Sequence, residues 1–150
     1  MTAERLRLFV LVLFIVGSVG TGAELILLGH VEGGWQLAPV VLLGGSLLAL
    51  AWQAAERGPR STRCFQVAMV LFVASGLSGL WLHYVGNAEF ELEMYPSLSG
   101  LDLFQGAIAG ATPTLAPGTM IELGLLGLVY TYRHPFLVDA KTAEFTGVGS

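Results

Sequence analysis

Residues 6–28 read LRLFVLVLFIVGSVGTGAELILL, an apolar stretch with only two ionisable residues, Arg7 near its start and Glu24 near its end. About 20 helical residues cross the hydrocarbon core of a bilayer, so a run of this length indicates a transmembrane helix. Comparable apolar stretches follow at 37–55 and 64–85. The pattern predicts an all-α integral membrane protein.

The composition agrees with this fold class. Of the 150 residues, 54% are hydrophobic and 12% are charged, whereas an ordinary soluble domain has roughly 25% charged residues. Cys64 is the single cysteine, which excludes an internal disulfide and a cysteine metal cluster. The net charge of −4 gives no reason to expect nucleic acid as a partner.

A fourth apolar region, 101–132, is interrupted by the sequence GATPTLAPG at 110–118. As one helix the region would reach ~48 Å, against a hydrocarbon core of ~30 Å. Proline removes a helical hydrogen bond, so we expect a break at Pro113 and Pro117. A short re-entrant or surface segment would cover 101–111, and a span capped by Thr112 or Thr114 would cover 115–132. The alternative is one long helix kinked at the prolines.

These segments predict a four-transmembrane-helix bundle over 1–132, with spans at 6–28, 37–55, 64–85 and 115–132 and a tail at 133–150. Basic residues occur only at or before the start of the first span, between the second and third, and after the fourth. The positive-inside rule then places both termini in the cytoplasm, and we expect a bacterial inner membrane. The basic residues are Arg5, Arg7, Arg57, Arg60, Arg63, Arg133 and Lys141.

A weaker pattern suggests that the bundle is a duplicated helical hairpin. Aligning His30 with His83 also aligns Gly33 with Gly86, and each half then reads as helix, histidine, acidic loop, proline, helix. Such a repeat would have its axis along the membrane normal. Chance similarity between apolar helices is the alternative explanation.

Candidate site residues gather in the outer half of the predicted bundle. Ionisable side chains at membrane depth are costly and usually face the bundle interior, so we expect Glu24 and Glu122 to point inward. The alternative is a buried carboxyl with a purely structural hydrogen bond. His30 and His83 would stand near the outer boundary, where a histidine can also be an ordinary interfacial residue.

Imidazole and carboxylate groups together suit zinc, iron, manganese or copper. We therefore predict Glu24, His30, His83 and Glu122 as inner metal ligands or proton carriers. Glu32, Glu89 and Glu91 would collect cations at the outer surface. In a β-strand, Glu89, Glu91 and Glu93 of the alternating segment NAEFELE would share one face, although a solvated loop is the plainer interpretation.

The first functional hypothesis is therefore a membrane protein that binds a cation or transition metal at a site open to the outer side. The second is a non-catalytic accessory subunit of a larger membrane complex, with homo-oligomerisation also open. The third is an electron carrier with haem b held between His30 and His83. The sequence contains no Walker loop, nucleophile elbow, zincin motif or dinucleotide fingerprint, so it assigns no enzymatic activity.

Overall fold

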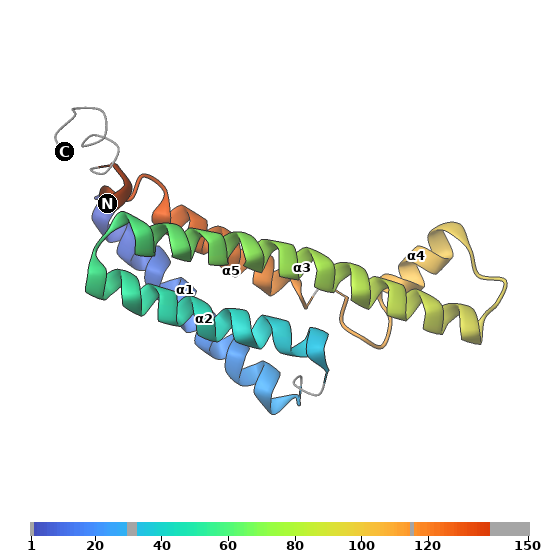
Figure 1. The fold of residues 1–150 in the computed structure, drawn as a ribbon. Helices are drawn as coiled ribbons and strands as arrows, with labels where there is room; N and C mark the ends of the chain where they lie inside the picture. The colour runs from blue at the N-terminus through green and yellow to red at the C-terminus, as the bar shows by residue number, and fades with distance from the viewer. Residues whose placement is uncertain (1, 30–32, 115, 139–150) are drawn as a thin grey trace.

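The computed structural model describes residues 2–29, 33–114 and 116–138. These residues form no strand and include five labelled α-helices: α1 Ala3–Leu27, α2 Gly34–Glu56, α3 Pro59–Met94, α4 Gly100–Ile108 and α5 Gly118–Thr131. Residues 135–138 are also helical. The start of α1 and the turn between α2 and α3 lie at one end of the molecule (Figure 1). The opposite end carries α4, which lies beside the far end of α3.

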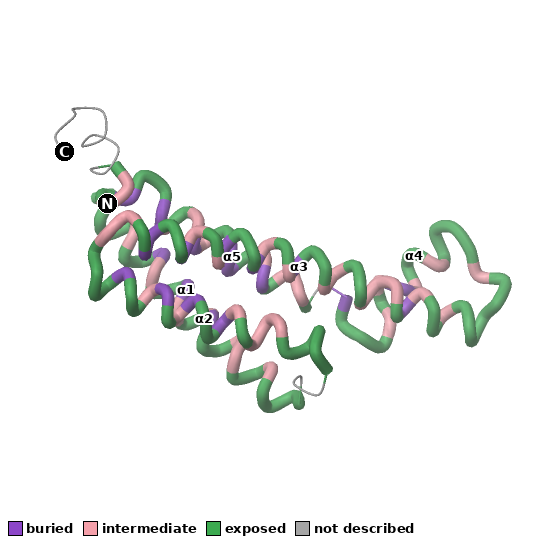
Figure 2. Tube along the Cα trace, in the orientation of Figure 1, coloured by how far each residue is buried: buried purple, intermediate pink, exposed green. Residues whose placement is uncertain are grey.

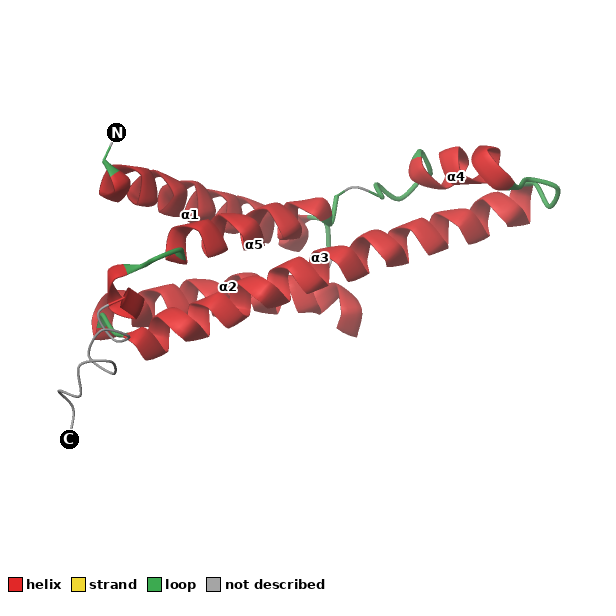
Figure 3. Ribbon diagram, turned by 90° about the horizontal axis from the view of Figure 1, so that it is seen from above, coloured by secondary structure: helices red, strands yellow, loops and turns green. Residues whose placement is uncertain are grey.

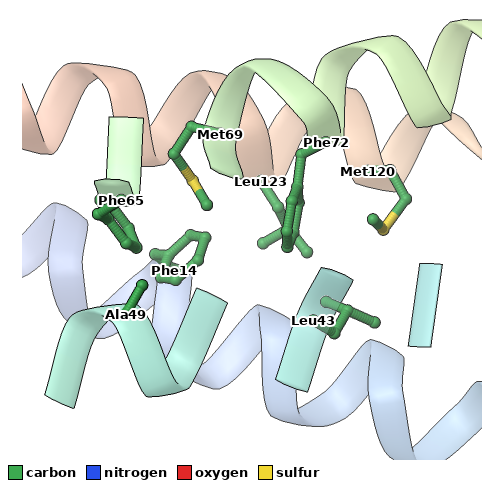
Figure 4. Close-up of a cluster of buried hydrophobic side chains, with 8 residues drawn as sticks. All are labelled: Phe14, Leu43, Ala49, Phe65, Met69, Phe72, Met120 and Leu123. Carbon is green, nitrogen blue, oxygen red and sulfur yellow. The ribbon is translucent and has the colours of Figure 1, made fainter. Parts of the chain in front are cut away.

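Helices α1, α2, α3 and α5 pack around one apolar core. Phe14 of α1 contacts Phe65 of α3 edge to face, with ring centroids 5.3 Å apart. The ring centroid of Phe72 lies 6.2 Å from that of Phe14. Figure 4 shows the buried side chains of these four helices converging. The buried cluster consists of Phe14, Leu43, Ala49, Phe65, Met69, Phe72, Met120 and Leu123.

The outside of the helices is also apolar. Figure 2 shows that buried residues are only short, separate segments of each long helix, and that most of each helix is exposed or half-buried. Trp35 and Leu48 on α2 are 81% and 74% exposed. Such a surface is unfavourable in water and favourable in hydrocarbon. By length and composition, α1, α2 and α3 can each cross a membrane, and α5 is a shorter apolar helix.

Helix α3 is longer than the predicted span at 64–85. Its 36 residues correspond to ~54 Å, so it extends well past a ~30 Å hydrocarbon core. The acidic segment after Asn87 belongs to this helix, so the strand and loop interpretations are wrong. The second half of the chain therefore lacks the loop that the duplication would require directly after His83.

On a helix the acidic residues separate. Glu89 and Glu93, four positions apart, share one face of α3, and Glu91 points to another. A Cβ placed on Gly106 of α4 would lie 3.3 Å from the Glu91 side chain. Glu91 therefore packs against α4.

The break in the fourth apolar region is confirmed. Helix α4 ends at Ile108 and α5 begins at Gly118, so no continuous helix joins 101 to 132. In Figure 3, α4 and α5 follow one another along α3. The predicted caps are wrong: the N-cap of α5 is Pro117. Thr114 instead donates its hydroxyl to the Ala107 carbonyl.

Glycines bring α5 close to its neighbours. A Cβ on Gly76 would lie 2.9 Å from the Pro117 carbonyl oxygen, and one on Gly79 would lie 2.7 Å from the Pro117 ring. Farther along α5, a Cβ on Gly124 would lie 2.8 Å from the Met69 carbonyl oxygen of α3. Small residues of this kind allow helices to pack closely in a membrane.

Candidate functional site

The connection between α4 and α5, residues 109–117, is held by one buried side chain, Asn87 of α3. Its amide nitrogen donates to the carbonyl oxygens of Ala107 (2.9 Å) and Thr112 (2.7 Å) and to the hydroxyl of Thr114 (2.9 Å). Its amide oxygen accepts from the Thr112 backbone N–H at 3.1 Å. Two N–H groups serve three acceptors, so at least one of these bonds is shared. Asn87 thus satisfies backbone groups that the interrupted helix leaves without partners.

His83, one helical turn before Asn87 on α3, also bonds to this connection. Its Nδ1 lies 3.0 Å from the Pro113 carbonyl oxygen. A carbonyl oxygen only accepts, so Nδ1 carries the proton and donates. In the neutral ring, Nε2 is then the unprotonated nitrogen. His83 has a role in holding the break, and Nε2 is its only atom suited to bind a metal.

The two membrane-depth carboxylates do not face the interior, so that expectation is wrong. Glu24 and Glu122 are both exposed. On α5 the buried positions recur with helical spacing, and Glu122 is turned by about 100° from its buried neighbour Leu123. The interior at this level is already filled by apolar and small residues. The buried positions of α5 are Met120, Leu123, Gly124, Gly127 and Thr131.

The remaining predicted ligands are not gathered either. Glu89 is exposed, Glu91 is half-buried against α4, and His83 is half-buried beside Pro113. His30 and Glu32 lie outside the described residues. Within the described ranges, no three His, Cys, Asp or Glu side chains stand close enough to hold one metal ion. Metal and haem binding therefore stay predictions without a described ligand set.

A second polar cluster, which sequence reasoning missed, lies at the opposite end of the bundle. Gln53 is buried; it accepts a hydrogen bond from the Tyr130 hydroxyl at 3.1 Å and donates to the Thr62 hydroxyl at 3.0 Å. Thr62 in turn donates to the Gly58 carbonyl oxygen at 2.9 Å. The lone glutamine inside an apolar stretch was the available sequence signal. The chain of bonds ties α2, α3 and α5 together.

Arg7 closes the end of α5. Its guanidinium donates to the carbonyl oxygens of Tyr130, Tyr132 and Arg133, at 3.2, 3.3 and 3.3 Å. Carbonyls at a helix C-terminus lack intrahelical donors and carry partial negative charge, so a cation is favourable there. Arg7 therefore links the start of α1 to the end of α5.

His134 follows α5 and is only 7% exposed. Its ring lies 5.4 Å from the Tyr130 ring and 4.7 Å from the Phe136 ring. Its Nδ1 is buried and has no hydrogen-bond partner within the part of the chain that the structure describes. Burial lowers the pKa of His134 below its usual 6.5, and the positive charge of Arg7 lowers it further. The ring is therefore held in its neutral form.

Chemically, these arrangements serve packing more directly than catalysis. The polar side chains of both clusters bond to one another or to the backbone, and no nucleophile is paired with a base among the described residues. Comparison of the chain with protein-family models, with curated proteins and with solved structures found no match in any of the three.

Proposed function

We propose that this chain is a non-catalytic accessory subunit of a larger membrane complex, with α1, α2, α3 and α5 as its four spans. In this proposal α5 begins below the outer boundary, because the 109–117 connection enters the bundle beside Gly79 and His83. Its 14 residues cover only ~21 Å. Flanking irregular residues are then shielded by α3, as backbone at membrane depth requires.

One observation carries the proposal: Glu122 lies exposed at the middle of the bundle. The adjacent Leu123 packs against Gly17, in the middle of α1, and Ile121 on the other side of Glu122 packs against Gly76, in the middle of α3. Glu122 therefore sits at the depth where both of these candidate spans would be surrounded by hydrocarbon. It points away from the core rather than into it.

Lipid chains offer no hydrogen-bond partner to a carboxyl group, whatever its ionisation state. Placing an acidic side chain near the bilayer centre costs at least ~2.5 kcal/mol on insertion scales. A neighbouring helix with a donor at the same depth removes this cost. The exposed face of α5 would suit such a helix, with Thr119 one turn above Glu122 and Leu125 and Val129 below it.

The far end of α3, together with α4, supports the same function from outside the membrane. This hairpin extends beyond the rest of the bundle (Figure 1). Phe90 and Phe104 are about half exposed on it, and Leu101 is more so. Exposed apolar side chains on a protruding arm favour contact with another protein.

Site-specific photocross-linking in native membranes tests this proposal. A photoreactive residue at Leu125, on the Glu122 face of α5, should form a product with a different protein. Val41 on α2 is also exposed and provides the matched position, which should yield no protein product. Combining the Leu125 probe with Glu122→Leu should remove the product, because the partner loses its hydrogen bond. Glu122→Gln, which can still bond, should keep part of it.

Three results would contradict the accessory role. The first is a product with only a second copy of the chain, which would indicate a homo-oligomer. The second is the same protein product from Leu125 and Val41, and the third is a product that persists undiminished in Glu122→Leu. The unfolding midpoint of each variant in detergent is the control, since Glu122 makes no contact in the core and its replacement should leave the fold intact.

A further inference from the structure

A groove opens between α1 and α2 at the end of the molecule that carries Arg57, Arg60 and Arg63. Its volume is about 520 Å³. Its walls are mainly apolar side chains of α1 and α2, and Tyr130, His134 and Phe136 also line it. The groove is separate from Glu122 and from the α3–α4 hairpin, on which the proposed accessory role rests.

Two of the polar side chains that line the groove are already hydrogen-bonded to other residues. The Tyr130 hydroxyl donates to Gln53, and the Gln53 amide donates to Thr62. The Nδ1 atom of His134 is buried beneath the surface. Among the lining residues, the neutral His134 ring therefore keeps a nitrogen without a partner in the described chain, but that nitrogen is buried, and the groove offers a head group little else that is both polar and uncharged.

The cation at the mouth of the groove is unoccupied. Arg57 is exposed and lines the groove. No carboxylate of the described chain pairs with its guanidinium, because the adjacent Glu56 instead accepts from the Ser61 backbone N–H at 3.0 Å. Arg57 ends α2 in a left-handed conformation, with φ 51°. The nearby Arg7 is already engaged with the carbonyls that end α5.

We propose that this groove binds one anionic phospholipid, with an acyl chain between α1 and α2 and the phosphate on Arg57. Apolar walls suit the chain, and a single unpaired guanidinium suits the phosphate. Basic pockets between transmembrane helices at the cytoplasmic side bind anionic head groups in this way. The charge at the mouth selects an anionic lipid over a neutral lipid or a quinone.

Native mass spectrometry of the full-length protein, released from micelles with phosphatidylglycerol or phosphatidylcholine, measures this preference. Wild type should retain one phosphatidylglycerol in preference to phosphatidylcholine. Arg57→Gln should lower the preference by about tenfold, the effect of losing a charge-assisted hydrogen bond. The matched control is Arg60→Gln, which removes the same charge at the same end but outside the groove. It should change the preference by no more than about fivefold, the general effect of one basic residue near an anionic surface.

A second variant tests the walls of the groove separately from its charge. Ala54→Trp fills the groove while keeping Arg57, so it should abolish retention of phosphatidylglycerol. The proposal is overturned if Arg57→Gln and Arg60→Gln behave alike, if wild type retains both lipids equally, or if Ala54→Trp binds as wild type does. Retention of a neutral quinone that is unaffected by Arg57→Gln would also overturn it. Unfolding midpoints without added lipid establish that each variant is folded.

Discussion

The side chain of Asn87 and the backbone of Thr112 exchange hydrogen bonds in both directions. The amide nitrogen of Asn87 donates to the Thr112 carbonyl oxygen at 2.7 Å, and the amide oxygen accepts from the Thr112 N–H at 3.1 Å. A side-chain amide thereby replaces the backbone partner that Thr112 would have in a continuous helix. The residue that fixes the break in the fourth apolar region lies on α3, outside that region.

Replacing Asn87 by alanine should therefore destabilise the protein. The N–H and the carbonyl of Thr112 would lose their partner, while the Ala107 carbonyl would keep only the Thr114 hydroxyl. An unsatisfied buried polar group costs about 1–3 kcal/mol. Unfolding in detergent should detect this loss, and limited proteolysis should cut the 109–117 connection faster. Glu93→Ala, an exposed position on the same helix, is the control. Equal stability of Asn87→Ala and Glu93→Ala would show that the network contributes little.

Gly76 should be intolerant of even one added methyl group. A Cβ there would lie 2.9 Å from the Ile121 backbone nitrogen and 2.9 Å from the Pro117 carbonyl oxygen. Backbone cannot move aside as a flexible side chain can, so Gly76→Ala should lose about 1–3 kcal/mol. Gly44→Ala in α2 is the matched control, because its Cβ would meet nothing within 4 Å.

Gly44→Ala should instead gain up to about 1 kcal/mol from helix propensity. Unfolding midpoints of both variants, measured in one detergent, show whether Gly76→Ala is destabilised and Gly44→Ala is stabilised. If Gly76→Ala is as stable as Gly44→Ala, then α3 and α5 do not approach as closely as the structure places them.

Because His134 is buried, the folded protein should lose stability in mild acid. Burial, assisted by Arg7, lowers its pKa in the folded state below 6.5. As pH falls below 6.5, the unfolded chain takes up the proton first and the folded state becomes relatively less stable. The contribution is complete above pH 6.5 and disappears as pH falls through the folded-state pKa. Between pH 8 and pH 5, the unfolding free energy of wild type should fall by more than that of His134→Gln. Parallel curves would exclude this role.

Much of the fold follows from hydropathy and proline placement. The apolar stretches at 6–28 and 37–55 correspond closely to α1 and α2, and the prolines at 113 and 117 fall in the break between α4 and α5. The length of α3 does not follow, because NAEFELE has no helical apolar period of its own. It is helical because Asn87 bonds to the 109–117 connection and Glu91 packs on α4. These tertiary contacts involve residues far along the chain.

The candidate site was harder to predict for a similar reason. Hydropathy identified Glu122 as unusual but did not give its direction around the helix. That direction depends on which side of α5 meets α1 and α3. Gly124 and Gly127, three positions apart, indicate the packed side, and Glu122 lies off it. Asn87 follows an apolar stretch and begins a polar segment typical of a loop, and its role depends on hydrogen bonds to Thr112, which is far along the chain.

The orientation in the membrane is the last prediction, and it rests on the distribution of basic residues. In a Cys64→Ala background, cysteines replacing Gly34 and Glu93 should react with an impermeant thiol reagent outside intact cells, because both positions are exposed at the end without basic residues. A cysteine replacing Gly58 should react only after permeabilisation. The backbone there, at φ −126°, suits any residue, and the exposed Glu56 side chain, 3.2 Å from the new Cβ, has to shift only slightly. The reversed pattern would place Arg57 and its groove at the outer leaflet, away from the anionic lipids of the cytoplasmic surface. Labelling of all three positions in intact cells would instead mean that the four helices do not form a closed set of spans.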